Sequence, residues 1–273
     1  MNVSPLTTDT YIYLKVSIAF HGQVGIMDCM VQLLTTSNPK TQKGIKRGYL
    51  TTIQHFAPSK LSGTNVCTDA TPECIRYCLN KAGRGGIYKK GETTNRIQEA
   101  RVKRTQLFLD DFLLYKAQLV KEIASHIKKA EKLGLEPCVR LNGTSDLAWE
   151  AEPVYAAETS SVFWRFAGVQ FYDYTKSFDR YMSFLNGPWP TQNYYLTFSR
   201  SELNHAQCIK ILSLGGSVAA VFDDVPDNFC GYPVLDGDTD DLRFMDTQGC
   251  WVGLKAKGKL KQSYSPFKVE IQA

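Results

Sequence analysis

The sequence predicts an α/β fold built on a parallel sheet, and two observations lead to that prediction. From Gly48 onward, short apolar segments alternate with longer amphipathic ones, as strands and helices do in such folds. The short segments are apolar at successive positions, which indicates strands covered by helices. With 43% hydrophobic and 22% charged side chains in 273 residues, the composition is that of a globular chain and excludes disordered, collagen-like and coiled-coil classes.

The expected elements follow one another along the chain. Six strands are expected at residues 49–56, 138–143, 169–174, 193–199, 217–222 and 250–256. A first helix should span about residues 94–108, with Asn95 as its cap. A second should span residues 110–134, because its apolar side chains recur every three or four positions. A third is expected near residues 202–214, where two glycines follow it.

These units fit one domain at residues 37–273, a parallel (β/α)6-type partial or full TIM-like barrel, preceded by an N-terminal extension at residues 1–36. An open doubly wound sheet fits the same order of elements. The longest apolar stretch, residues 11–20, contains a lysine and is shorter than the roughly 20 residues that a membrane span needs. No membrane partner is therefore expected.

Polar residues follow five successive strands of the predicted sheet. In either architecture, ligands bind beyond the carboxyl ends of the strands. A small-molecule ligand is therefore expected at this mouth of the barrel, although polar residues are also common in ordinary loops. The candidate cofactor-binding residues are Asn142, Ser145, Asp146, Asp173, Lys176, Ser199 and Arg200.

Three of the eight cysteines lie together in the loop after the first strand. Cys67, Cys74 and Cys78 are separated by six and three residues. Zinc usually takes four ligands in two close pairs, and no second CxxC or HxxxH pair exists in the sequence. Iron–sulfur clusters are held by thiolates with varied spacing. The spacing therefore favours a 4Fe–4S cluster on three cysteines, with one iron open, over three thiols without a metal.

Positive charge is concentrated in residues 81–104. This segment holds eight Lys and Arg residues against two Glu, a net charge of +6 in a chain whose total is +5. Such a segment indicates an anionic partner, which is a phosphate, a nucleic acid or an anionic metal cluster. A solvated helix face is the alternative explanation.

Two other patterns in the sequence contain residue types that bind metals. Asp236, Asp238 and Asp240 have calcium-loop spacing, but the glycine and glutamate that an EF-hand needs are absent. A turn held by ion pairs to Arg243 is expected instead. Cys230 follows the fifth strand, yet it would need its loop to fold over the mouth. We therefore expect a fourth cluster ligand that is not a cysteine.

Six parallel strand–helix units with a three-cysteine loop after the first strand resemble the partial barrel of radical S-adenosylmethionine enzymes. Tyr77, directly before Cys78, resembles the aromatic residue that precedes the last cysteine in that family. The resemblance implies S-adenosylmethionine as a candidate second cofactor, with Asn142, Ser145 and Asp146 as hydrogen-bonding groups.

A closer resemblance rests on eight sequence segments. They are SNPKTQKG, APSKLSGTNVC, CLNKAGRGG, ARVKRT, RLNGTSDL, FYDYTK, LTFSRSE and DGDTDDLRF, within residues 37–262. These segments are similar to those of a phage and prophage family labelled "gene product 88". The resemblance implies a bacteriophage protein acting in the host cytoplasm or associated with the virion, and it implies no particular reaction.

Three functions therefore stay open at the level of sequence. The first is an iron–sulfur enzyme, radical-SAM-like or of another kind, whose open iron binds substrate. The second is a non-catalytic iron–sulfur protein with a redox or structural role. The third is a nucleic-acid-binding protein that contacts phosphates through residues 81–104 and uses the cysteines for a structural metal.

Overall fold

The computed structural model describes residues 31–36, 39–152, 161–187 and 192–271. The chain divides into two compact units, Met1–Gln32 and Leu33–Ala273. Of the expected N-terminal extension, residues 1–30 lie outside the described residues.

A mixed α/β fold is confirmed, and its sheet contains ten strands among the described residues. The strands are β1 (Leu34–Thr35), β2 (Tyr49–Gln54), β3 (Glu136–Arg140), β4 (Gln170–Thr175), β5 (Tyr194–Ser199), β6 (Val218–Phe222), β7 (Asn228–Phe229), β8 (Tyr232–Asp236), β9 (Trp251–Lys255) and β10 (Lys268–Val269). Their order is β1-β2-β3-β4-β5-β6-β9-β8-β7, with β10 paired to β6.

Most strand pairs are parallel, as expected. Only the two edge pairs, β1 with β2 and β7 with β8, are antiparallel among the described strands. The hydrogen-bonded path runs from β1 to β7 and does not close on itself. All six strands expected from the sequence form, each shifted by three residues or fewer at its ends.

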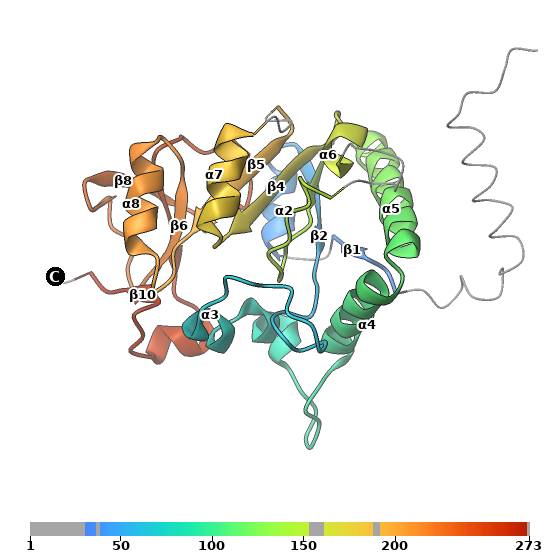
Figure 1. Cartoon of the computed structure of the whole chain (residues 1–273), viewed down its shortest axis with the longest axis horizontal. Coiled ribbons are helices and arrows are strands. Elements are labelled where there is room, and N and C mark those ends of the chain that lie inside the picture. Colours follow the sequence, from blue (N-terminus) through green and yellow to red (C-terminus); the bar gives the residue numbers. More distant parts are fainter. Residues whose placement is uncertain (1–30, 37–38, 153–160, 188–191, 272–273) are drawn as a thin grey trace, which may run out of the picture. The chain divides into compact units, whose positions relative to one another are not determined.

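The helices are α2 (Pro39–Ile45), α3 (Pro72–Arg76), α4 (Arg96–Asp110), α5 (Phe112–Lys132), α6 (Val162–Arg165), α7 (Phe178–Asn186) and α8 (His205–Ser213). Of these, α5, α7 and α8 cover one face of the sheet (Figure 1), whereas α2 lies against the other face, where its Gly44 is close to Thr51 and Leu242. Side chains of α5, α7 and α8 join the sheet in one hydrophobic core, with Tyr115, Tyr181 and Ile211 as members. None of the described helices is long and apolar enough to cross a bilayer.

The three helices expected from the sequence form with the predicted caps, except at the start of α5. Asn95 caps α4 by accepting hydrogen bonds from Ile97 N and Gln98 N. Asp111, rather than Asp110, caps α5, because its carboxylate accepts the N–H of Leu114 at 2.9 Å. Asp110 instead ends α4.

The second face of the sheet is covered by residues 236–248. Leu242 and Phe244 of this segment pack against Tyr49, Cys138 and Tyr172. The expected ion-paired turn is confirmed, since Arg243 lies 3.4 Å from Asp240 and 3.0 Å from Asp246.

Candidate functional site

The three-cysteine segment, residues 57–78, lies across the carboxyl ends of the strands (Figure 1). We call it the cysteine loop. Its Val66 carbonyl accepts the backbone N–H of Asp146 at 2.9 Å, and the Cys67 thiol donates to the Thr144 carbonyl at 3.5 Å. The loop is thus fixed against the segment that follows β3.

The second half of the loop is held by α3 and by residues that follow β5. Thr71 caps α3, and its hydroxyl donates to Glu202 at 2.8 Å. Glu202 also accepts the Glu73 N–H at 3.3 Å. The Glu73 carboxylate in turn accepts the hydroxyl of Ser265 near the C-terminus. These contacts set the position of Cys74 on α3.

The three cysteines lie close enough for their charges to interact. Burial raises the pKa of Cys67 to about 12, and the negative charges of Cys78, Asp146 and Cys74 add to this. Burial likewise raises the pKa of Cys78, with a further contribution from Cys74. Without a bound cation or metal, these two thiols are therefore protonated at neutral pH.

Two cations near Cys78 would stabilise its thiolate. Arg101 of α4 and Lys176, which follows β4, both favour its thiolate and lower its pKa against the effect of burial. Arg101 is 8% exposed and donates to Asn80 through Nη1, at 3.0 Å to the carbonyl and 2.5 Å to Oδ1. An anionic group at the thiols would therefore meet positive charge on two sides.

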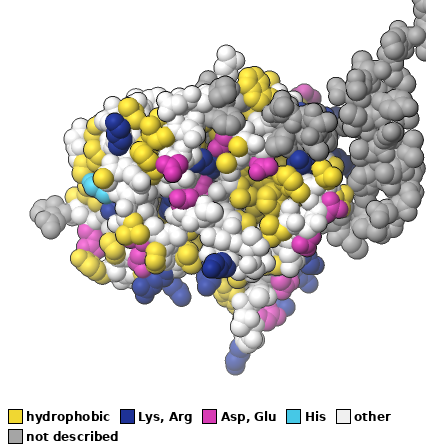
Figure 2. Space-filling model, viewed as in Figure 1, with side chains coloured by type: hydrophobic (Ala, Val, Ile, Leu, Met, Phe, Trp, Pro, Cys, Tyr) yellow, Lys and Arg dark blue, Asp and Glu magenta, His cyan; other side chains and the backbone are white. Residues whose placement is uncertain are grey.

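The basic segment divides into two groups in the structure. Arg101 and Arg104 are buried on the face of α4 that also buries Gln98 and Thr105. The remaining cations are exposed: Lys81, Arg84, Lys89, Lys90, Arg96 and Lys103. Several Lys and Arg side chains gather at the lower edge of the view in Figure 2, where the loop between α3 and α4 projects. Of these cations, Arg101 acts on Cys78 through its charge.

Three candidate ligand-binding residues are bonded to one another. Asp173 accepts the backbone N–H of Asn142 at 2.7 Å and its side-chain amide at 3.2 Å. Asn142 Oδ1 accepts the Ser145 hydroxyl at 2.8 Å. Burial raises the pKa of Asp173 to about 7, against the lowering effect of Arg180 and Arg140. These polar groups shape the turn after β3.

Asp146 joins this group to a buried ion-pair network. Arg180 Nη1 donates to Asp146 at 2.7 Å, and Arg180 also binds Glu150 at 2.6 and 2.8 Å. The Arg180 side chain is 7% exposed. We call Asn142, Ser145, Asp146, Glu150, Asp173 and Arg180 the closed network, since each of its acids is paired with a donor within it.

The other candidates line the same end of the sheet. Lys176 donates its backbone N–H to Asp146 at 2.8 Å and its ammonium to the Ser199 hydroxyl at 2.6 Å. Arg200 donates to the carbonyls of Pro266 and Phe267 at 3.2 and 3.0 Å. The structure therefore brings Asp146, Lys176 and Ser199 to the cysteine loop, with Arg200 bound to the C-terminal segment.

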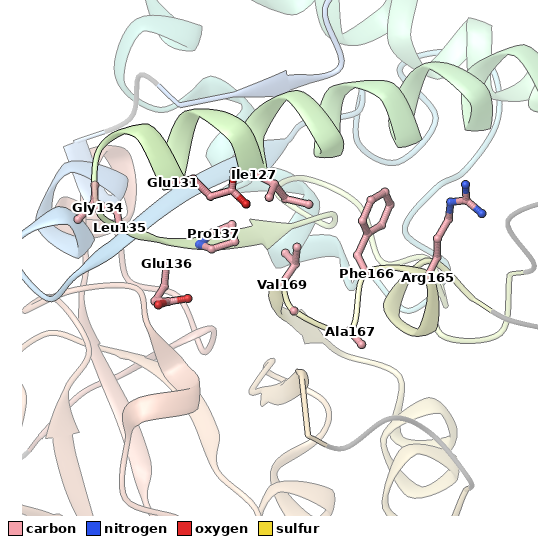
Figure 3. Close-up of a pocket in the computed structure, with 11 residues that line it drawn as sticks. Ile127, Glu131, Gly134, Leu135, Glu136, Pro137, Arg165, Phe166, Ala167 and Val169 are labelled. Carbon is pink, nitrogen blue, oxygen red and sulfur yellow. The ribbon is translucent and has the colours of Figure 1, made fainter. Parts of the chain in front are cut away.

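A cavity of about 730 Å³ lies at the opposite end of the sheet (Figure 3). Its lining includes Ile127 of α5, Glu136 and Pro137 at the start of β3, and Val169 before β4. No candidate site residue lines this cavity. It is thus separate from the cysteine loop.

Within the described ranges, no group of three or more His, Cys, Asp and Glu side chains has an arrangement that could hold a single metal ion. Cys138, Cys208 and Cys250 are buried, and Cys230 is exposed. The Cys230 sulfur lies 3.9 Å from His205 Nε2. None of these four contributes to the charge interactions of Cys67 and Cys78.

Sequence reasoning did not select two residues beside the site, His55 and Arg101. His55 follows β2, and its pKa is lowered to about 3 by burial and then by Arg101, Arg140 and Arg104. Arg101 was counted only within the basic segment. Gln98, Arg101 and Thr105 are three and four residues apart, so they share one face of the helix. This spacing could have distinguished Arg101 from the exposed cations of the basic segment.

The fold and the site define a mixed α/β protein with a three-cysteine loop over the carboxyl ends of a mostly parallel sheet. A family model described as "Gene product 88" matches residues 32–267. The chain belongs to that family. Neither the curated proteins nor the solved structures gave a match to this chain.

Proposed function

We propose that this protein binds a 4Fe–4S cluster through Cys67, Cys74 and Cys78, at the mouth of a barrel similar to that of radical S-adenosylmethionine enzymes. The observation that carries the proposal is the convergence of three partly buried cysteines on one loop beside Arg101 and Lys176. Thiolates are the usual ligands of such clusters.

The donor set fits this group in two respects. A thiolate-ligated cluster is anionic, and the two cations at Cys78 would compensate part of its charge. A cubane is also larger than a single ion, so its cysteine sulfurs stand farther apart than the ligands of one metal ion do. Loop segments fixed at Val66 and Thr71 would limit how far the sulfurs move on binding.

When bound, the cluster would supply one-electron chemistry and an iron without a cysteine ligand. The chain's own contribution is to position and shield this group. Asp146 and Glu202 anchor the loop, while Lys176 joins β4 to β5 through Ser199 and keeps its charge beside Cys78. S-adenosylmethionine, or another small molecule, would bind at the mouth next to Lys176 and Ser199.

Catalysis and a purely redox or structural role differ in one measurable property. An enzyme of the radical S-adenosylmethionine type cleaves that molecule reductively, which a structural cluster does not.

Because of its family, we place this protein in the cytoplasm of the host of a phage or prophage.

Nucleic-acid binding is a second candidate function, favoured by the exposed cations of residues 81–96. Tyr88, which is exposed, lies among these cations and offers an aromatic ring for base stacking. Binding of a single-stranded oligonucleotide should then weaken steeply with salt. A double variant, Lys89→Met with Lys90→Met, should reduce that salt dependence, and salt-independent binding would contradict this function.

The cluster is tested by metal analysis of cysteine variants. Anaerobically purified protein should be brown and contain iron and sulfide, whereas Cys67→Ser, Cys74→Ser and Cys78→Ser should each lose most of the iron. Cys250→Ala, which removes a buried thiol at the other end of the sheet, is the matched control and should keep it. Colourless protein with stoichiometric zinc would overturn the proposal.

A further inference from the structure

Three arginines surround His55 next to the cysteine loop. Ile53 of β2 is paired in register with Arg140 of β3, so His55, two residues beyond Ile53, lies on the same face as Arg140. Arg104 of α4 donates to the His55 carbonyl at 3.4 Å. Arg101, one turn earlier on α4, acts on both His55 and Cys78 through its charge.

Carboxylates near His55 offset the positive charge of two of the three arginines. Asp241 binds Arg140 at 3.1 Å and also accepts the hydroxyl of Tyr172 at 2.8 Å. Glu122 lies close enough to favour the charged form of Arg104. Within the described ranges, Arg101 in contrast has only the neutral groups of Asn80 as hydrogen-bond partners. Its positive charge is therefore buried without a carboxylate bound to it.

Two guanidinium nitrogens near His55 have no acceptor within the described part of the chain. Arg101 Nε and Arg140 Nε are both buried and unpartnered, and the whole Arg101 residue is 8% exposed. Leaving a buried, charged N–H without an acceptor is costly. Both side chains lie near one imidazole, so a single small group that accepts hydrogen bonds could satisfy both.

The geometry points to a binding site for an oxyanion, the carboxylate or phosphate group of a small ligand, formed by Arg101, Arg140 and His55. Guanidinium groups match such oxyanions in both charge and the direction of their N–H bonds. His55 and Arg140 keep partial exposure, which gives the ligand a route to the site. The site stands on these side chains alone and does not require the cluster, although Arg101 would place the ligand beside Cys78.

The test uses the full-length chain, with inorganic phosphate and citrate as probes. A bound anion favours the imidazolium form, so each probe that binds should raise the pKa of His55, measured from its ring C–H resonances by NMR. The charged groups that face this ring are Arg101, Arg140, Arg104 and Asp241. The resonance is assigned by its loss in His55→Gln. If neither probe changes the pKa of His55, the proposal is overturned.

Affinity measurements on variants of α4 identify the residue responsible. Arg101→Met should weaken binding of the probe by roughly tenfold or more, the effect of one charge-assisted hydrogen bond. Lys103→Met, an exposed neighbour on the same helix, is the matched control and should bind as the wild type does. An equal loss in both variants would show attraction by general charge and overturn the site.

A third variant keeps the test decisive if Arg101→Met fails to fold. Arg101→Lys retains the positive charge but lacks the Nε–H, so it should bind the probe more weakly than the wild type while still folding. Unchanged affinity in Arg101→Lys would contradict the role of that N–H. Since neither the probes nor the readouts involve iron, this result is independent of the iron content that tests the cluster.

Discussion

The closed network and the cysteine loop lie side by side at the carboxyl ends of the strands, yet their polar groups behave differently. In the closed network each carboxylate is paired, as Asp146 is with Arg180 at 2.7 Å. At the cysteine loop, the thiols of Cys67 and Cys78 have raised pKa values, and Arg101 keeps an unpartnered N–H. We infer that the first region stabilises the fold, whereas the second is arranged for a bound group.

The largest expected effect is on stability, from Arg180→Met. Removal of the guanidinium leaves Asp146 and Glu150 buried without a cation, a change that costs about 3–5 kcal/mol in buried pairs. Urea denaturation of the metal-free protein measures the loss of unfolding free energy. Lys103→Met, an exposed control, should change stability by less than about 0.5 kcal/mol. An equally small effect of Arg180→Met would refute the division into two regions.

A smaller effect is expected in the pH dependence of stability. The pKa of His55 is lowered to about 3 in the folded protein, below the ordinary value of about 6.5 in the unfolded chain. The unfolded state therefore takes up a proton first, and stability is lost as pH falls below 6.5 toward 3.

The variant His55→Gln isolates this contribution. Between pH 7.5 and pH 5, the wild type should lose about 2 kcal/mol more unfolding free energy than His55→Gln does. Asp173, with a pKa raised to about 7, acts in the opposite direction, but it is present in both proteins and cancels in the difference. Parallel pH profiles for the two proteins would contradict the assignment.

A local effect is expected from Thr71→Ala. The change removes the cap of α3 and the hydrogen bond to Glu202, which stabilises the helix by about 1 kcal/mol. Amide hydrogen exchange of residues 73–78 should become faster, while exchange in the sheet stays unchanged. Thr68→Ala, an exposed threonine of the same loop, serves as the control. Equal exchange in the two variants would show that Thr71 does not hold the loop.

The smallest effect, none at all, is expected for iron content in Cys230→Ser. The thiol lies 3.9 Å from His205, on the turn between β7 and β8, and takes no part in the charge interactions of Cys67 and Cys78. Iron and sulfide analysis of anaerobically purified protein checks this. A loss as large as that in Cys74→Ser would identify Cys230 as the fourth ligand.

Hydrophobic periodicity was sufficient to predict the main strands and the three longer helices. It did not reveal β1, β7 and β10, because two-residue strands carry no measurable alternation. The five-residue strand β8 was also missed, and none of its residues is buried. Helix α7 was also missed, although its residues 178–186 contain an amphipathic pattern. Pairing of β10 with β6, 47 residues apart at Val269 and Phe222, depends on tertiary contacts that no local pattern contains.

The predicted strand ends indicated where the candidate site lies. They did not indicate which of its side chains are already paired with other residues. Asp146 and Lys176 were selected as ligand-binding residues because they follow strands. Whether a carboxylate such as Asp146 is available or already paired depends on Arg180, 34 residues away. The sequence shows residue types at the strand ends, and only the packed structure shows which partners they find.

The most direct test of the central claim is Mössbauer spectroscopy of the full-length chain, produced with 57Fe and purified without oxygen. Binding of a cluster by Cys67, Cys74 and Cys78 predicts the spectrum of a 4Fe–4S cluster, with one iron distinguished from the other three. The spectrum should disappear in Cys74→Ser and persist in Cys250→Ala. A wild-type protein that contains no iron, or only mononuclear iron, would contradict the claim.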